Sequence, residues 1–276
     1  MLAEINETEA TGDIAAIFED VRRLWGVPYV SAIQRHLATR PGVLEWAWEA
    51  VGPAFQSGAA QRAAHAAVQG LAVPPLMPIP REALTLWGVD EKGLAAIRGC
   101  AEGFVRVAPI NMMFAGLMTA LLGGASPGGG GGASSHEPAW TVPPPLPAPP
   151  SMVAPDKLDA AARSVLMRFA TMNDGKPFVP GLYRMLAHWP AFLAHLATVL
   201  PPRLSEPAVA SAFDLIRKRI DEAVPGVLAG LPSTPTRRPM PSTAERTHFQ
   251  TIRGTYRKTS PELVVLGTLI GDALPR

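Results

Sequence analysis

Asn111 is the residue in this chain whose type and surroundings most clearly suggest a chemical role. It lies in the otherwise apolar segment INMMFAGLM, where helix propensity gives no reason for an amide. One interpretation is structural: the side chain caps the N-terminus of a helix or bonds within its first turn. The other is functional: the amide holds a water molecule or a substrate oxygen in a pocket. The sequence leaves both interpretations open.

The common signatures of catalysis and of metal binding are missing from the sequence. It contains no GxSxG, no HExxH and no P-loop, and the glycine run Gly128–Gly132 lacks the Lys-Ser/Thr pair that phosphate binding requires. The six histidines show no ligand spacing with cysteine or carboxylates. His188 and His195 are seven residues apart and could share a helix face, but ordinary surface or core histidines are the favoured interpretation. We therefore predict no metal and no cofactor.

Composition excludes several classes of protein. The net charge is +2 with scattered Lys and Arg, so we expect no nucleic-acid partner. The one cysteine, Cys100, rules out an internal disulfide and is expected to be a buried, inert thiol. The N-terminus MLAEINETEA carries acids where a signal peptide needs bases, and the longest apolar run, Met112–Leu122, is too short to cross a bilayer. These features predict a soluble cytoplasmic protein that does not enter a membrane.

A repeated motif organises the chain. Gly26–Leu44 and Gly175–Leu193 lie at a constant offset and are identical at eight of nineteen positions. The identities include glycine and proline, whose backbone preferences are special, and not only common apolar residues. A match at a fixed spacing indicates an internal duplication. We expect two similar helical halves that form a pseudo-dimer.

The division between the halves is expected in the Gly/Pro-rich segment 123–155. It contains GGASPGGGGGASS and VPPPLPAPP, has no hydrophobic periodicity and is typical of a flexible, then polyproline-like linker. We therefore predict an N-terminal helical repeat at residues 1–122 and a C-terminal one at residues 156–276. No stretch alternates with period two for long, which predicts an all-α fold.

Helix boundaries follow from capping residues and prolines. Asp90 and Asp156 are each expected to cap a helix, and Ser242-x-x-Glu245 is a capping box. Pro109 is expected to interrupt one helix, and Ser260–Pro261 to begin another. The helices that we expect with definite ranges are Asp13–Trp25, Ser31–Ala38, Asn111–Leu122, Pro190–Leu200 and Leu263–Asp272.

Three segments together resemble a known family. They are GVPYV followed by RHLATRPGVLEWAW, the second copy PFVPGLYRMLAHWP, and NMMFAGLMTAL. In this order they resemble the group I 2-haloacid dehalogenases, the DehI family, over most of the chain. The resemblance implies an all-α pseudo-dimer with a pocket between its halves. It also implies a hydrolase in which water displaces halide from the α-carbon of a small 2-haloalkanoic acid, without a cofactor.

The resemblance also assigns roles to individual positions. Asn111 falls on the family's water-orienting asparagine, and Tyr29 on an aromatic that lines the active-site pocket. Ala32 stands where the family has a second bulky aromatic, so the pocket here is expected to be wider. Leu182 occupies the position of the aspartate that acts as general base, and an alkyl side chain cannot accept a proton. Gly181 and Tyr183, its neighbours, are expected to contact the substrate.

Few residues could replace the missing base. Asp174 is expected in a turn, and Glu45 has no specific placement. Tyr183 and His188 are near position 182 in sequence, but Tyr183 titrates too high to act unaided.

Three hypotheses about function therefore remain. The first is a 2-haloacid dehalogenase, and the second is an inactive or repurposed homologue that binds a small apolar carboxylic acid. The third is a helical interaction protein whose duplication serves assembly. In the first two the partner is a small carboxylic acid, and a homodimer is compatible with all three.

Overall fold

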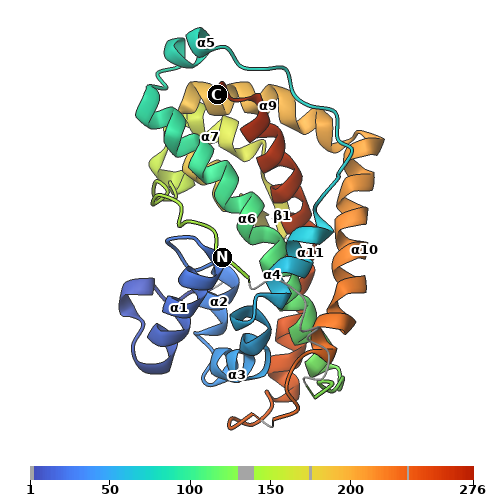
Figure 1. The fold of residues 1–276 in the computed structure, drawn as a ribbon. Helices are drawn as coiled ribbons and strands as arrows, with labels where there is room; N and C mark the ends of the chain where they lie inside the picture. The colour runs from blue at the N-terminus through green and yellow to red at the C-terminus, as the bar shows by residue number, and fades with distance from the viewer. Residues whose placement is uncertain (1–2, 130–139, 174–175, 235) are drawn as a thin grey trace. The chain divides into compact units, whose positions relative to one another are not determined.

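The computed structural model describes residues 3–129, 140–173, 176–234 and 236–276, and these residues form an almost entirely helical protein. They contain eleven α-helices, two short 3₁₀ helices (η1, Glu7–Glu9, and η2, Pro155–Lys157) and one pair of three-residue strands (Figure 1). The predicted all-α class is confirmed.

The chain divides into two compact units, each built from three segments. Unit 1 contains Met1–Gln69, Val107–Leu146 and Ile216–Ser260. Unit 2 contains Gly70–Arg106, Pro147–Leu215 and Pro261–Arg276. Each unit therefore takes segments from both sides of the predicted linker. The first copy of the repeated motif belongs to unit 1 and the second copy to unit 2.

Unit 1 begins with four short helices: α1 (Gly12–Trp25), α2 (Ala32–Leu37), α3 (Val43–Gln56) and α4 (Ala59–Ala67). Helix α1 ends where sequence predicts, because Gly26 adopts the left-handed conformation (φ 65°) and its N–H bonds to the carbonyl of Arg22. Helices α1 and α2 both pack on α3 (Figure 1). Trp25 stacks on Phe55 of α3, with ring centroids 4.9 Å apart, and both rings are fully buried.

Three long helices contribute residues to both units: α6 (Glu91–Leu122), α10 (Pro207–Ala229) and α11 (Thr243–Ala273). The predicted interruptions in two of them are wrong, because α6 continues through Pro109 and α11 through Pro261. A proline inside a helix loses one backbone hydrogen bond and costs about 3 kcal/mol. Buried residues flank both prolines, including Ala108 and Ile110 in α6, and we attribute the continuity of both helices to their packing.

Unit 2 contains the helices α5 (Arg81–Leu86), α7 (Ala160–Met167), α8 (Gly181–Leu186) and α9 (Pro190–Leu204). Strands β1 (Thr171–Asn173) and β2 (Lys176–Phe178) pair antiparallel, with Thr171 opposite Phe178. These strands were not predicted, because three residues are too few to establish a period of two.

Two of the predicted capping residues behave differently. Asp90 accepts a hydrogen bond from the N–H of Gly93 (2.7 Å), as expected for the start of α6. Asp156 instead lies in η2, and the cap of α7 is Asp159, whose Oδ1 accepts from the N–H of Ala162 (2.8 Å). Both aspartates precede an apolar pattern, so sequence alone does not separate them. At α11 the N–H of Glu245 donates to Ser242 Oγ (3.3 Å), which confirms one half of the predicted capping box.

The described residues of the predicted linker form no helix or strand until η2 begins at Pro155. They nevertheless bond to the unit that contains them. The N–H of Gly128 donates to the carbonyl of Leu228 in unit 1, and that of Val153 to the carbonyl of Arg184 in unit 2. Trp140 lies against Gly58, where an added Cβ would approach the Trp140 Cβ to 1.9 Å. The linker is therefore irregular, as predicted, but its described ends are packed.

The two copies of the repeated motif carry similar elements. Helices α2 and α8 are each six residues long, and each is followed by a helix that begins near the shared proline, α3 at Val43 and α9 at Pro190. Helices α6 and α11 are 32 and 31 residues long. These likenesses agree with a duplication, which stays a prediction, as does the division at residues 123–155.

Helix α6 is long and apolar enough to cross a membrane, by length and composition alone. The helix is longer than the apolar run Met112–Leu122, because it continues back through Pro109 to Glu91. Within the protein, 72% of the most apolar window of α6 is buried, which is also a property of core helices. Cys100 on the same helix is buried as predicted, and burial raises the pKa of its thiol to about 11.

Candidate functional site

Asn111 lies in the middle of α6, not at its N-terminus. The helix begins at Glu91, so the capping interpretation of this amide is excluded. Asn111 is 6% exposed, in the apolar interior of unit 1. A buried amide in this position requires hydrogen-bond partners, because an unpaired polar group there would be costly.

Two buried side chains supply these partners. Trp25 Nε1 of α1 donates to Asn111 Oδ1 at 3.3 Å, and Gln34 Nε2 of α2 donates to the same oxygen at 3.1 Å. Trp25 and Gln34 are both fully buried. We call these three residues the amide cluster. It holds the side chain of Asn111 in one orientation through α1 and α2.

The amide cluster has unused hydrogen-bonding capacity. Both bonds to Asn111 reach Oδ1, and in the described part of the chain no bond is recorded from its Nδ2. Gln34 Oε1 is buried and has no partner among the described residues. A donor and an acceptor of this kind are what a bound water molecule needs. The cluster therefore has the types of polar group that bind a water.

Sequence analysis found Asn111 but missed Trp25 and Gln34. Trp25 had the spacing of the apolar face of α1 and was interpreted as core, which it also is. Gln34 is a polar residue in a short helix whose other buried residues are Ile33, His36 and Leu37. A polar residue beside several buried positions was the available signal, but six residues are too few to show which face is buried.

The other predicted site residues of unit 1 lie near the start of α2. Ala32 is the first residue of α2, and Tyr29 lies in the connection between α1 and α2. Both side chains are half-buried. Tyr29, Ala32 and the amide cluster therefore belong to the same unit and to consecutive elements.

The remaining predicted site residues open α8 in unit 2. Leu182 is fully buried and Tyr183 is 4% exposed. Tyr183 stacks on Phe169 at 4.1 Å between ring centroids, and burial, followed by the charge of Glu262, raises the pKa of its hydroxyl. An added Cβ at Gly181 would lie 3.0 Å from Met152 Cε, so a larger residue would meet Met152 there. Leu182 offers no proton acceptor.

None of the suggested replacement bases gains support from the geometry. Asp174 lies outside the described residues. His188 is exposed, and its Nε2 lies 2.9 Å from the carbonyl of Ser151. Glu45 belongs to unit 1 and faces Arg238 at 3.8 Å. Among the described residues, no group of three or more His, Cys, Asp and Glu side chains is placed to hold a metal ion.

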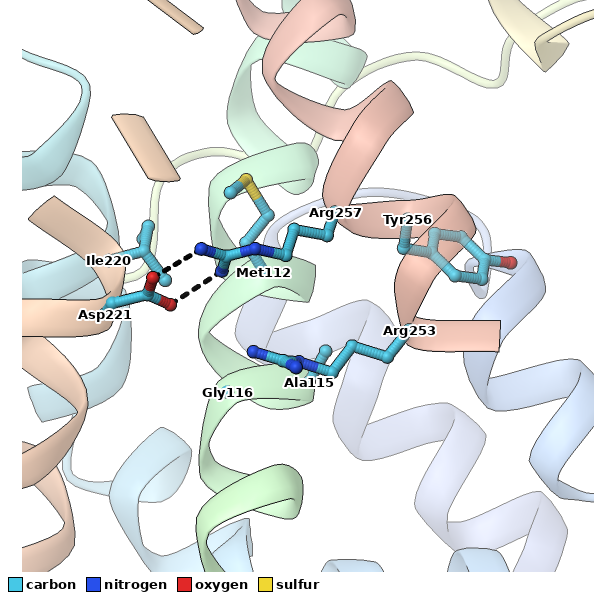
Figure 2. A pocket seen from close by; sticks show the side chains of 8 residues that line it. All are labelled: Met112, Ala115, Gly116, Ile220, Asp221, Arg253, Tyr256 and Arg257. Carbon is cyan, nitrogen blue, oxygen red and sulfur yellow. Dashed lines mark hydrogen bonds and ion pairs between the residues drawn. The ribbon is translucent and has the colours of Figure 1, made fainter. Parts of the chain in front are cut away.

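Helix α6 also borders a small hollow in unit 1 (Figure 2). It has room for about one water (about 20 Å³) and opens to solvent. Its walls come from α6, α10 and α11, and are formed by Met112, Ala115, Gly116, Ile220, Asp221, Arg253, Tyr256 and Arg257. Sequence analysis predicted none of these residues as a site, because the hollow forms only where three distant helices meet.

The chain has the all-α fold of the 2-haloacid dehalogenases. One similar solved structure is a D-2-haloacid dehalogenase variant in complex with D-2-CPA, and another is a D-2-haloacid dehalogenase in complex with L-LA. Each is 19% identical to this chain, has a TM-score of 0.78, and aligns over 99% of this chain and 96% of its own. A third, also a D-2-haloacid dehalogenase variant, has a TM-score of 0.77 over the same shares. No protein-family model matches the sequence, and no curated protein matches it significantly.

The structural likeness confirms the resemblance found in the sequence motifs at the level of the fold. It extends over the full length of the chain, including both copies of the repeated motif. At 19% identity it defines the class of fold, and the activity has to be argued from the site residues.

Proposed function

We propose that this protein acts on small 2-haloalkanoic acids, displacing the halide with water. The observation that carries the proposal is the haloacid dehalogenase fold over 99% of the chain, together with a buried Asn111. In this reaction an oriented water attacks the α-carbon, the halide leaves with the electrons of the carbon–halogen bond, and one proton of the water passes to solvent. The product is a 2-hydroxy acid.

The amide cluster supplies the water-orienting part of this chemistry. Trp25 and Gln34 fix Asn111 Oδ1, so Asn111 Nδ2 and Gln34 Oε1 are the groups that would hold the water. A fixed amide lowers the entropic cost of placing the nucleophile. The substrate contacts expected at Tyr29, Ala32, Gly181 and Tyr183 are part of the proposal and rest on the sequence resemblance.

The second candidate is a homologue that binds a small carboxylic acid without hydrolysing it. The observation that favours it is the fully buried alkyl side chain of Leu182, at the position to which the sequence resemblance assigns the general base. General-base assistance is typically worth about 10²–10⁴-fold in rate, so its loss would leave any hydrolysis slow.

Halide release from a panel of 2-haloacids tests the first proposal. Purified protein should release chloride from 2-chloropropionate above the rate in buffer, and Asn111→Leu should abolish that excess. No release with any member of the panel would contradict hydrolysis. A rise in melting temperature with propionate or lactate would then support the second candidate, because a ligand that binds the folded state stabilises it.

Leu182→Asp tests whether the missing base is the cause of low activity. We expect halide release to rise by about 10²-fold or more if position 182 is the base position. Leu182→Asn is the matched control. Asparagine has nearly the same shape as aspartate and is also polar, but its amide cannot act as a general base. Since Leu182 is fully buried, both variants should lose on the order of several kcal/mol of stability, which urea denaturation measures. Equal activity of two folded variants would place the base elsewhere.

A further inference from the structure

The hollow between α6, α10 and α11 contains an unusual arrangement of charges. Arg257 of α11 and Asp221 of α10 form a two-point ion pair, with Nη–Oδ distances of 2.7 and 2.5 Å (Figure 2). This pairing satisfies the carboxylate of Asp221 and holds the guanidinium of Arg257 in place. The pair therefore forms a fixed, neutral wall of the hollow.

Arg253 adds a positive charge without a counterion. It precedes Arg257 by one helical turn on α11, and its guanidinium extends toward Ala115 and Gly116 of α6 (Figure 2). Among the described residues it makes no hydrogen bond and no ion pair. Burial and the neighbouring charge of Arg257 lower the pKa of Arg253, and Asp221 only partly opposes them. The two arginines and one aspartate leave a net charge of +1 at the hollow.

The rest of the wall is apolar. Met112, Ala115 and Ile220 are all at most 5% exposed and present carbon and sulfur to the hollow. A partly desolvated guanidinium against such a wall is stabilised by an anion that pairs with it. The planar fork of arginine fits a carboxylate at two points.

From these features we propose that the hollow is a carboxylate-binding site in which Arg253 pairs with the carboxylate of a small monocarboxylic acid. Met112 and Ile220 contact the short carbon chain of that acid. A dianion such as phosphate is disfavoured, because one unpaired cation cannot neutralise it and Asp221 repels the excess charge. The hollow has room for about one water (about 20 Å³), so the ligand is small, pairs with Arg253 at the open side of the hollow and stays partly in solvent.

This inference deepens the proposed function, and the choice of a carboxylate rests on that function. The hollow and the amide cluster both belong to unit 1, and Arg253 supplies the recognition group for the acid. Neither the motifs nor the repeated segment indicated Arg253. Binding by Arg253 does not require that the chain hydrolyses anything.

Calorimetric titration of the full chain with propionate tests the site. We expect propionate to bind the parent protein, and Arg253→Met to weaken it by about 10- to 100-fold, the effect of losing a charged hydrogen-bond partner. Arg253→Lys should recover only part of the affinity, because lysine keeps the charge but not the fork. Arg246→Met is the matched control: Arg246 lies on the same helix outside the hollow, its guanidinium donates to the nearby Thr243 (3.1 Å), and its loss should leave the affinity unchanged.

The outcomes separate this inference from the proposed function. Arg253-dependent binding of propionate without halide release would sustain the site and reject hydrolysis. Halide release with the same KM in the parent and in Arg253→Met would sustain hydrolysis and reject the site. Inorganic phosphate that binds the parent as tightly as propionate would also overturn the proposed selectivity. Melting curves show whether each variant is folded. If Arg253→Met is unfolded, the propionate affinity of Arg253→Lys tests the site instead.

Discussion

At the scale of single residues, the amide cluster joins three elements of unit 1 through one oxygen atom. Asn111 Oδ1 accepts from Trp25 on α1 and from Gln34 on α2, and all three side chains are buried. A buried hydrogen bond of this kind adds little net stability when it forms. Removing one partner is costly, because the other polar group is then buried without a partner. The cluster therefore specifies how α1, α2 and α6 meet.

We predict that Asn111→Leu destabilises the protein through the donors that it leaves unpaired. Each buried donor without a partner costs about 1–3 kcal/mol, and there are two. Urea denaturation measures the change in the free energy of unfolding. The double variant Asn111→Leu with Gln34→Leu should be less destabilised than the sum of the two single variants, because it removes one orphaned donor. If the losses of unfolding free energy in the two single variants simply add in the double variant, the hydrogen bond between Gln34 and Asn111 is contradicted.

A second residue-scale feature is a pair of histidines in unit 1. His36 Nε2 lies 2.8 Å from His248 Nε2, and His36 Nδ1 lies 2.6 Å from the carbonyl of Ala3. A carbonyl only accepts, so His36 Nδ1 carries the proton and its Nε2 accepts from His248. Burial lowers the pKa of His248, electrostatic interactions with Arg40 and His36 lower it further, and Glu245 opposes them.

The pH dependence follows from the direction of this shift. The pKa of His248 is lower in the folded than in the unfolded state, so the unfolded state binds the proton first as pH falls. The stabilisation from neutral His248 is complete above its ordinary pKa of about 6.5 and is lost below it. We therefore expect the melting temperature to fall between pH 7 and pH 5, and to fall less in His248→Gln. Identical pH profiles for parent and variant would contradict this role.

At the scale of elements, the start of α7 shows how one side chain sets a helix boundary. Asp156 and Asp159 both stand before the helix, but only Asp159 accepts a backbone hydrogen bond from its first turn. Residues 155–157 instead form η2, which ends before α7 begins.

We predict that Asp159→Ala costs about 0.5–2 kcal/mol of stability, the usual effect of losing an N-terminal cap. Asp156→Ala is the matched control and should change stability by less than about 0.5 kcal/mol, as expected for a surface residue outside a cap. Thermal denaturation of the two variants beside the parent gives both values. A larger loss in Asp156→Ala than in Asp159→Ala would reverse the assignment.

At the scale of the whole molecule, the compact units are interleaved along the chain. Unit 1 is completed by Ile216–Ser260, which supplies the buried Ile220, Phe249 and Ile252. Unit 2 is completed by Gly70–Arg106 from the N-terminal part. Neither sequence half therefore contains a complete unit.

We predict that Met1–Gly123 expressed alone does not fold cooperatively. It lacks the last segment of unit 1 and would expose the apolar side chains that this segment covers, which favours aggregation. Size-exclusion chromatography and a thermal melt check this. A soluble monomer with a sharp melting transition would mean that the N-terminal half is self-sufficient.

The sequence alone determined the class of fold, the helices α1 and α2, the end of α1 before Gly26 and the chemical interest of Asn111. These features depend on local properties, namely hydrophobic spacing, glycine conformation and the rarity of an amide in an apolar helix. The duplication and the cytoplasmic location stay predictions.

Tertiary structure decided what local patterns cannot encode. It carried α6 and α11 through their prolines, because packing outweighs the lost hydrogen bond. It gave Asn111 its partners from α1 and α2, and it placed Arg253 beside an ion pair between α10 and α11. It also buried Leu182 completely. Each of these facts depends on residues far apart in the chain, whose proximity exists only once the helices have packed.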